Sequence, residues 1–380
     1  MSWKVPLADV NFDTQEEDAV RGVIQSGWLS MGPVTKEFER VFAEFVKVRH
    51  ALAVTNATAA LHIALLAAGI GPGDEVIVPS LTFVATVNAI RYTGAVPVFA
   101  DIESLDWLTI SPDSIRSRIT ERTRAIMVMH YAGFPCDMSA IQEIANNNDL
   151  VLIEDAAHAI GSNLNGRDLG TFGSLGCFSF FANKNMTTAE GGMVVTDNEI
   201  LAEKCSLLRS HGMTSLSWDR HQGHASSYDV VDIGYNYRID EIRSALGLVQ
   251  LKKLPAGNIQ RRELTALYRE MLTDRTPSIR IPFSDDRGFS CCHIFPILLP
   301  PGCDRHKFMN SLREKGIQSS NHYPPVHLFS IYQDKWRLQD HPLPLTEEAS
   351  QRQVTLPLFS TMHVEQVSLV VEAVALALQE

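Results

Sequence analysis

The sequence predicts an α/β protein whose main domain holds a mostly parallel, seven-stranded sheet between helices. Short apolar runs alternate with longer helical patterns from about residue 50 to 200. The runs are continuously apolar, as expected for parallel strands that helices cover on both faces. The predicted strands are 51–55, 75–79, 96–101, 124–130, 150–155, 177–181 and 192–197.

Two helical patterns matter most for the prediction. In the segment 56–74, alanine and leucine recur at helical spacing and glycine and proline follow, so a helix is expected to begin near Asn56. A strand, a short turn and a helix N-terminus together form an arrangement that binds anions. A second helical pattern at 239–254 is expected to end the large domain near Pro255.

The length of the chain, 380 residues, favours two domains. We expect a large domain at 13–254 and a smaller C-terminal α+β domain at 255–380, with residues 1–12 packed against the smaller one. The C-terminal part contains the stretch NHYPPVH at 321–327 and a final helical pattern at 364–379.

Composition excludes several classes of protein. The chain has no apolar run of membrane-spanning length, and its N-terminal residues lack the pattern of a secretory signal, so a cytoplasmic protein is expected. The net charge of −11 opposes general binding to nucleic acid. The six cysteines form no CxxC pair, which argues against a disulfide framework and a thiolate metal site.

A carboxylate ends one of the predicted strands. The run 150–155 finishes in Asp155, and ligands of open α/β sheets bind at the carboxyl edge of the strands. Asp155 is also interpretable as a helix N-cap. His158, three residues later, is on its own more often a hydrogen-bonded structural histidine than a catalyst.

Other candidate side chains lie beside further strand ends. The turn at 55–61 offers backbone N–H groups and the Thr58 hydroxyl to a phosphate, although most such turns merely cap helices. Ser179 adds a hydroxyl, and Phe83 offers a ring that could stack on a flat ligand, although a single phenylalanine is usually a core residue. Lys184 follows one apolar run and precedes a glycine pair and another run, where a surface lysine is the alternative.

In combination these residues predict a site for pyridoxal 5'-phosphate. A lysine is needed for the Schiff base, and a carboxylate keeps the pyridine nitrogen protonated so that the ring accepts electrons. A phosphate turn and an aromatic plate complete the set.

The motifs resemble those of the DegT/StrS-type sugar aminotransferases, a fold-type-I family dependent on pyridoxal phosphate. The resemblance is collinear from about residue 5 to 330. It rests on TNATAALHIAL, PSLTFVATVNAI, IEDAAHAIGS, FSFFANKNMTTAEGGMVVT, GYNYRIDEIRSALGLVQL and HYPPVH.

The resemblance implies a role for each matched position. Lys184 would be the Schiff-base lysine, Asp155 the partner of the pyridine nitrogen, and His158 a neighbour of the ring hydroxyl. Phe83 would stack on the ring. The cofactor phosphate would be held by Ala57, Thr58, Ser179 and, from the second subunit of a homodimer, Asn236.

The implied reaction is a transamination in two halves. An amino acid, commonly L-glutamate in this family, would give its amino group to the cofactor, and the acceptor would be a nucleotide-diphosphate-linked keto-deoxy sugar. Some similar proteins are sugar dehydratases with histidine in place of the lysine. Because Lys184 is present, transamination is favoured.

Substrate contacts are expected in two places. The segment 211–238 contains His211, Arg220, His221 and His224, a locally basic set suited to a sugar or its diphosphate. A metal site at His221 and His224 lacks an acidic or cysteine partner at suitable spacing. In the second place, His322, Tyr323 and His327 are candidates, with a proline-stiffened turn as the alternative.

Two other functions compete with the leading hypothesis. The first keeps the chemistry and changes the acceptor to a keto-cyclitol or another cyclic ketone. The second is a non-catalytic regulatory protein on the same fold, since fold alone does not fix function. The joint presence of Lys184, Asp155 and the phosphate residues argues against it, because a binding scaffold does not need a Schiff-base lysine.

Overall fold

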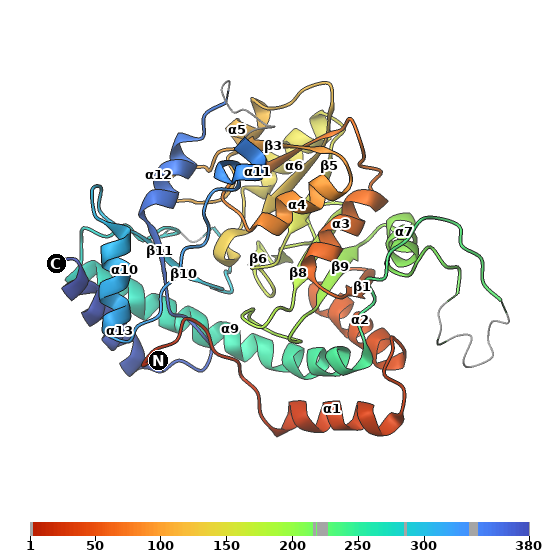
Figure 1. Ribbon diagram of the computed structural model, residues 1–380, viewed down its shortest axis with the longest axis horizontal. Helices are drawn as coiled ribbons and strands as arrows, with labels where there is room; N and C mark the ends of the chain where they lie inside the picture. Colours follow the sequence, from red (N-terminus) through yellow and green to blue (C-terminus); the bar gives the residue numbers. More distant parts are fainter. Residues whose placement is uncertain (1–2, 216–217, 219–226, 285–286, 334–340, 380) are drawn as a thin grey trace.

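The computed structural model describes residues 3–215, 218, 227–284, 287–333 and 341–379. Its centre is one seven-stranded sheet with the strand order β1-β9-β8-β5-β4-β2-β3 (Figure 1). The pairs that involve β9 are antiparallel and the other four are parallel, which confirms a mostly parallel sheet. The strands are β1 His50–Val54, β2 Glu75–Pro79, β3 Val96–Ala100, β4 Thr123–Met129, β5 Val151–Asp155, β8 Leu175–Ser179 and β9 Gly192–Thr196.

Helices cover both faces of this sheet, as the apolar runs predict. Alternate strand residues point to opposite faces: Leu52 and Val54 of β1 pack with α3, α4 and α7, whereas Ala51 and Ala53 pack with α2 and α9. The helices α5 and α6 lie on the same face as α2. The bounds are α1 Thr14–Ser26, α2 Pro33–Val46, α3 Ala57–Ala67, α4 Val84–Tyr92, α5 Pro112–Arg116, α6 Met138–Asn147, α7 Glu199–Arg209 and α9 Glu241–Arg275.

The helical pattern at 239–254 belongs to a longer helix, α9, which continues beyond Pro255. It begins after the N-cap Asp240, whose side chain accepts a hydrogen bond from the Arg243 N–H, and it continues through Pro255 to Arg275. Proline removes one helical hydrogen bond. Packing compensates on both sides of the proline, because Leu254 lies in a core of the large domain and Leu264 lies in the C-terminal core.

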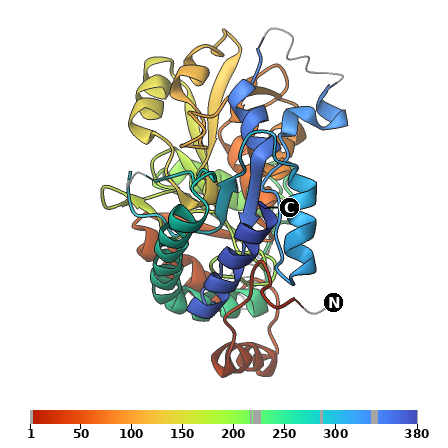
Figure 2. The ribbon, with the colours of Figure 1, turned by 90° about the vertical axis from the view of Figure 1, so that its left-hand side faces the viewer.

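The C-terminal part forms its own hydrophobic core against α9. A two-stranded antiparallel sheet, β10 and β11, packs with the last helix, which lies beside the C-terminal half of α9 (Figure 2). Val5 is in the same core, and the Lys4 N–H donates to the Gly316 carbonyl. These contacts support our proposal of two domains, with α9 shared between them. The helices and strands that follow α9 along the chain are β10 Phe295–Leu298, α10 Arg305–Glu314, α11 Ser330–Gln333, α12 Pro344–Arg352, β11 Gln353–Leu356 and α13 Val364–Ala377.

The described residues also include four short elements. Two short strands pair as a hairpin between β5 and β8, and two single 3-10 turns lie in loops. They are β6 Asn163–Leu164, β7 Arg167–Asp168, η1 Tyr131–Gly133 and η2 Val326–Leu328.

The described residues between α7 and α9, on either side of 216–226, extend away from the body of the molecule (Figure 1). They include an antiparallel bridge between Met213 and Val230. Val230, Val231 and Ile233 are exposed, Ile233 to 84%. In the described part of the chain, no helix has both the length and the apolar character needed to cross a membrane.

Candidate active site

A cavity of about 410 Å³ lies at the carboxyl ends of the parallel strands, where ligands of such sheets bind. It contains every cofactor residue expected from the sequence except Asn236. A second cavity of about 550 Å³ lies between α2, α7 and β1 and contains none of these residues. The first cavity is lined by Asn56, Ala57, Thr58, Leu61, Phe83, Ala85, Met129, Asp155, Ala157, His158, Ser179, Phe181, Asn183, Lys184, Glu190, His322 and Tyr323.

The N-terminus of α3 forms one wall of this cavity. The Asn56 side chain caps the helix by accepting from the Ala59 N–H at 2.8 Å. The first N–H groups of a helix have no intrahelical acceptor, so those of Ala57 and Thr58 remain for an anion. A Cβ at Gly192 would lie 2.6 Å from Asn56 C and 2.7 Å from Ala57 N. Glycine at this position therefore lets the start of α3 lie directly on β9.

Asp155 is fixed at the end of β5. Its Oδ2 accepts from the Thr86 hydroxyl at 2.7 Å, and its Oδ1 accepts from the Ala157 N–H at 3.1 Å. Burial raises the pKa of Asp155, and these two hydrogen bonds oppose that effect. A cationic ring nitrogen in the cavity would favour the carboxylate further.

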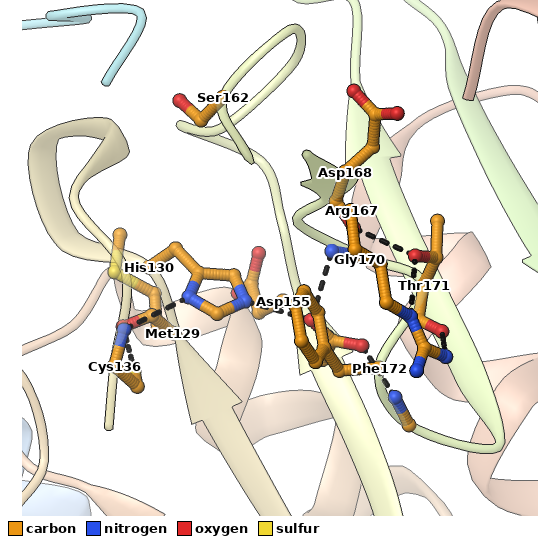
Figure 3. Close-up of polar contacts among 12 residues, drawn as sticks. Met129, His130, Cys136, Asp155, Ser162, Arg167, Asp168, Gly170, Thr171 and Phe172 are labelled. Atoms are coloured by element: carbon orange, nitrogen blue, oxygen red, sulfur yellow. Dashed lines mark hydrogen bonds and ion pairs between the residues drawn. The ribbon is translucent and has the colours of Figure 1, made fainter. Parts of the chain in front are cut away.

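The neighbouring Glu154 points to the opposite face of the sheet and anchors the same strand end. Its Oε2 lies 2.8 Å from His130 Nε2 and accepts from the Gly170 N–H at 2.8 Å, and its Oε1 accepts from the Gly173 N–H at 2.5 Å. The other ring nitrogen of His130 accepts from the Cys136 N–H (Figure 3). This buried network ties the loop 163–173 and the end of β4 to the strand that carries Asp155.

His158 and Tyr323 lie together at the cavity wall. The Ala132 N–H points at His158 Nδ1, so the ring proton is on Nε2 and is donated to the Tyr323 hydroxyl at 2.9 Å. Burial lowers the pKa of His158 well below its ordinary value, so the ring is neutral. The Tyr323 ring also meets the ring of Phe83, which is 53% exposed, at a centroid distance of 5.6 Å.

Lys184 lies in the turn between β8 and β9. Its N–H donates to the Phe181 carbonyl at 2.9 Å, and its side chain lines the cavity. Burial lowers the pKa of Lys184 to about 8, and the charge of Asp155 acts in the opposite direction. The neutral, nucleophilic amine is therefore much more abundant near physiological pH than in an ordinary lysine, although the ammonium form still predominates.

His293 contacts Lys184 and was not expected from the sequence. Its Nε2 lies 3.4 Å from Lys184 Nζ, and its ring centroid lies 4.3 Å from that of His158. The segment SCCHIF carries no motif, and 109 positions separate the two residues. Only the fold brings them together, because residues 291–293 lie between α9 and β10 along the chain, far from the turn that carries Lys184.

Not all expected substrate residues line the cavity. His322 does, and its Nδ1 lies 2.9 Å from the Thr355 hydroxyl. His327 is buried against Ser80, and His211 lies near Arg238 at 3.5 Å, both away from the lining. Asn236 is exposed and bridges to Ser210. Arg220, His221 and His224 lie outside the described residues.

The residues present fit pyridoxal phosphate. A helix start and two hydroxyls are suited to its phosphate, a buried carboxylate to its ring nitrogen, and a lysine with a lowered pKa to its aldehyde. Among the described residues, no group of three or more histidine, cysteine or acidic side chains is placed to hold a metal ion.

Comparison with known proteins agrees with this chemistry. A model of the DegT/DnrJ/EryC1/StrS aminotransferase family matches residues 11–375. The spore coat polysaccharide biosynthesis protein SpsC of Bacillus subtilis is 39% identical over 365 residues, which span 95% of this chain and 93% of SpsC.

Solved structures match over nearly the whole chain. Helicobacter pylori PseC, an aminotransferase involved in the biosynthesis of pseudoaminic acid, has a TM-score of 0.92 and 32% identity over 99% of both chains. DesI, solved in the presence of its TDP-sugar product, has a TM-score of 0.89 and 31% identity over 100% of this chain and 93% of its own. Structures of Spr1654 from Streptococcus pneumoniae in its pyridoxal phosphate and pyridoxamine phosphate forms also match.

Proposed function

The chain belongs to the DegT/DnrJ/EryC1/StrS aminotransferase family, and we propose that it transfers an amino group from L-glutamate to a nucleotide-diphosphate-linked keto-deoxy sugar. It is a pyridoxal phosphate-dependent sugar aminotransferase. The donor, the acceptor and the roles of single residues are the proposed part.

The observation that carries the proposal is that Lys184 and Asp155 line the same cavity, beside the start of α3. Bound pyridoxal phosphate supplies an aldehyde that exchanges amines and a ring that accepts electrons. Lys184 holds the cofactor covalently and, when free, moves a proton with its neutral amine. Asp155 stabilises a protonated ring nitrogen, and Phe83 and His158 fix the ring.

The phosphate is bound, in our proposal, by the N–H groups of Ala57 and Thr58 and the hydroxyls of Thr58 and Ser179. The dipole at the start of α3 favours the negative charge. The proposed acceptor is supported by the TDP-sugar product of DesI and by the polysaccharide pathway named for SpsC.

We further propose a homodimer in which Asn236 completes the partner's phosphate site. In the single chain Asn236 is exposed and lies outside the cavity, in the segment between α7 and α9. Val230, Val231 and Ile233, a few residues before Asn236, are exposed and form an apolar surface that a second copy of the chain would cover.

One experiment tests the cofactor and the donor. Purified protein is mixed with pyridoxal phosphate, and its visible spectrum is recorded before and after L-glutamate. Borohydride reduction and peptide mapping then locate the adduct. We expect a visible band that glutamate removes and an adduct on Lys184, with Lys184→Ala as the control that gives neither.

The acceptor is tested separately. Protein that has received the amino group of glutamate is incubated separately with nucleotide-linked keto sugars and with free keto-cyclitols. The aminated products are then identified by mass spectrometry. Amination of the cyclitols alone would replace the proposed acceptor. Absence of any adduct on Lys184 would overturn the proposed site.

A further inference from the structure

The structure assigns His293 as a catalytic residue that remains neutral and orients the Lys184 amino group by accepting its hydrogen bond at Nε2. This inference rests on the proposed function of Lys184 and adds a residue to it. The imidazole is 4% exposed, and its Nε2 lies 3.4 Å from Lys184 Nζ.

The tautomer of His293 follows from a chain of side-chain amides. Asn185 Nδ2 donates to the Cys291 carbonyl at 3.0 Å and to Asn258 Oδ1 at 2.8 Å. The amide of Asn258 is itself oriented, because its Nδ2 donates to the Ile160 carbonyl at 3.0 Å. Two backbone carbonyls, which only accept, therefore fix which end of each amide carries the hydrogens.

The oxygen of Asn185 is consequently the atom that faces His293. It lies 2.9 Å from His293 Nδ1, so this ring nitrogen must donate and carries the ring proton. In the neutral ring the lone pair is then on Nε2 and points at Lys184. In histidines generally, the hydrogen bond made by one ring nitrogen sets whether the other nitrogen donates or accepts.

The backbone of His293 is held as firmly as its ring. Its N–H donates to the Ala132 carbonyl at 2.9 Å, and its carbonyl accepts from Arg261 of α9 at 3.1 Å. The lone pair is thus presented from a fixed position. Lys184 is a flexible side chain, so an acceptor at a fixed place restricts where its amine can lie.

The groups around the pair leave the imidazole uncharged. Burial lowers the pKa of His293 well below its ordinary value, and the nearby cations Lys184 and Arg261 act in the same direction. Burial also raises the pKa of the Cys291 thiol to about 12, so Asp155 is the anion that faces Lys184. The titratable groups that face either residue are Asp155, His158, Arg261, Cys291 and His322.

The test measures the Lys184 amine directly, in protein loaded with pyridoxamine phosphate, where that amine is free. Competitive acetylation with acetic anhydride over a pH range, with the Lys184 peptide quantified by mass spectrometry, gives the pKa. A neutral acceptor stabilises the ammonium form, so His293→Phe is expected to lower the pKa of Lys184 by about one unit. In turnover, kcat falls roughly tenfold with the KM for L-glutamate unchanged.

Matched variants separate orientation from packing. His293→Gln keeps an acceptor oxygen and is expected to restore most of the pKa of Lys184 and of kcat, whereas His306→Phe, at an exposed histidine of α10, changes neither. Asn185→Leu removes the group that fixes the tautomer. It is expected to lower kcat, and nitrogen-15 NMR of its His293 ring would show both tautomers instead of the single Nδ1–H form of the wild type.

The outcomes are distinguishable from failure of the proposed function. If the wild type forms no adduct on Lys184, the proposed function fails. If the adduct forms, and His293→Phe leaves the pKa of Lys184 and kcat at wild-type values, the role of His293 is refuted. A wild-type His293 that is protonated on Nε2 refutes it as well, even if the phenylalanine variant does not fold.

Discussion

Replacing Gly192 by alanine tests whether the close contact between β9 and α3 builds the phosphate site. The added Cβ would lie 2.6 Å from Asn56 C and 2.7 Å from Ala57 N, both backbone atoms that cannot rotate away. Ordinary contact begins at about 3.4 Å, so relieving the contact with Asn56 C, the nearer of the two atoms, requires the start of α3 to move by about 0.8 Å.

The magnitude has two parts. Overpacking of this kind costs roughly 1–3 kcal/mol in the free energy of unfolding. With an unfolding entropy of about 2.1 cal/mol/K per residue, 380 residues give about 0.8 kcal/mol/K, so the Tm falls by about 1–4 °C. The hydrogen bonds from Ala57 and Thr58 to a phosphate lengthen, and because such charged bonds contribute about 1.5–3 kcal/mol, cofactor affinity falls roughly 10- to 100-fold.

The assay is a titration of protein with pyridoxal phosphate, followed by its visible absorption, together with thermal unfolding of the cofactor-free form. Gly22→Ala is the control, because Gly22 is inside α1 and a Cβ there meets nothing within 4 Å. It should keep cofactor affinity and gain about 0.5–1 kcal/mol from helix propensity. Wild-type affinity and Tm in the Gly192→Ala protein would refute the reasoning.

Three other predictions concern the site and its supports. Asp155→Asn should lower kcat at least about 100-fold while Lys184 still forms its borohydride-reducible adduct, since the amide cannot stabilise a protonated ring nitrogen; an unchanged kcat would contradict the role of Asp155. Glu154→Ala leaves three donors without an acceptor, two of them buried and the Gly173 N–H partly buried, and should lower the free energy of unfolding by about 3 kcal/mol or more in urea. Glu143→Ala, exposed on α6, should stay within about 0.5 kcal/mol, and equal values for the two variants would argue against the network. Asn236→Ala should weaken cofactor retention, and mixing it with Lys184→Ala should regain activity by forming one intact shared site per mixed dimer, whereas no gain on mixing would exclude the shared site.

The sheet and the centre of the site were predictable because each depends on local signals. Buried parallel strands have a continuous apolar pattern, and residues that directly follow such strands gather at one edge. Asp155 ends one run, and Lys184 lies in the turn between two others, so the pattern places both at strand ends, and the adjacency of β5 and β8 in the structure brings them into one cavity.

Residues whose position depends on distant packing were not predictable. His293 lies in a segment without a motif, and only the path of the chain through the C-terminal core brings it to the lysine. Asn185 directly follows Lys184 in a motif, but its contact with His293 depends on the same path. The continuation of α9 past Pro255 has the same origin, because a proline normally predicts a helix end and only the two cores on either side outweigh it. The place of Tyr323 against Phe83 and His158 likewise could not be read from the stretch NHYPPVH.

Because α9 is continuous, one helix packs into the cores of both the large and the C-terminal part of the molecule. Leu264 and Leu272 pack in the C-terminal core. Within the two turns before Leu264, Asn258 and Arg261 bind Asn185 and the carbonyl of His293. If the smaller domain rotated together with α9, the hydrogen bonds that position His293 beside Lys184 would shift. The alignment of the reactive amine and the seating of the smaller domain are therefore mechanically linked through a single helix.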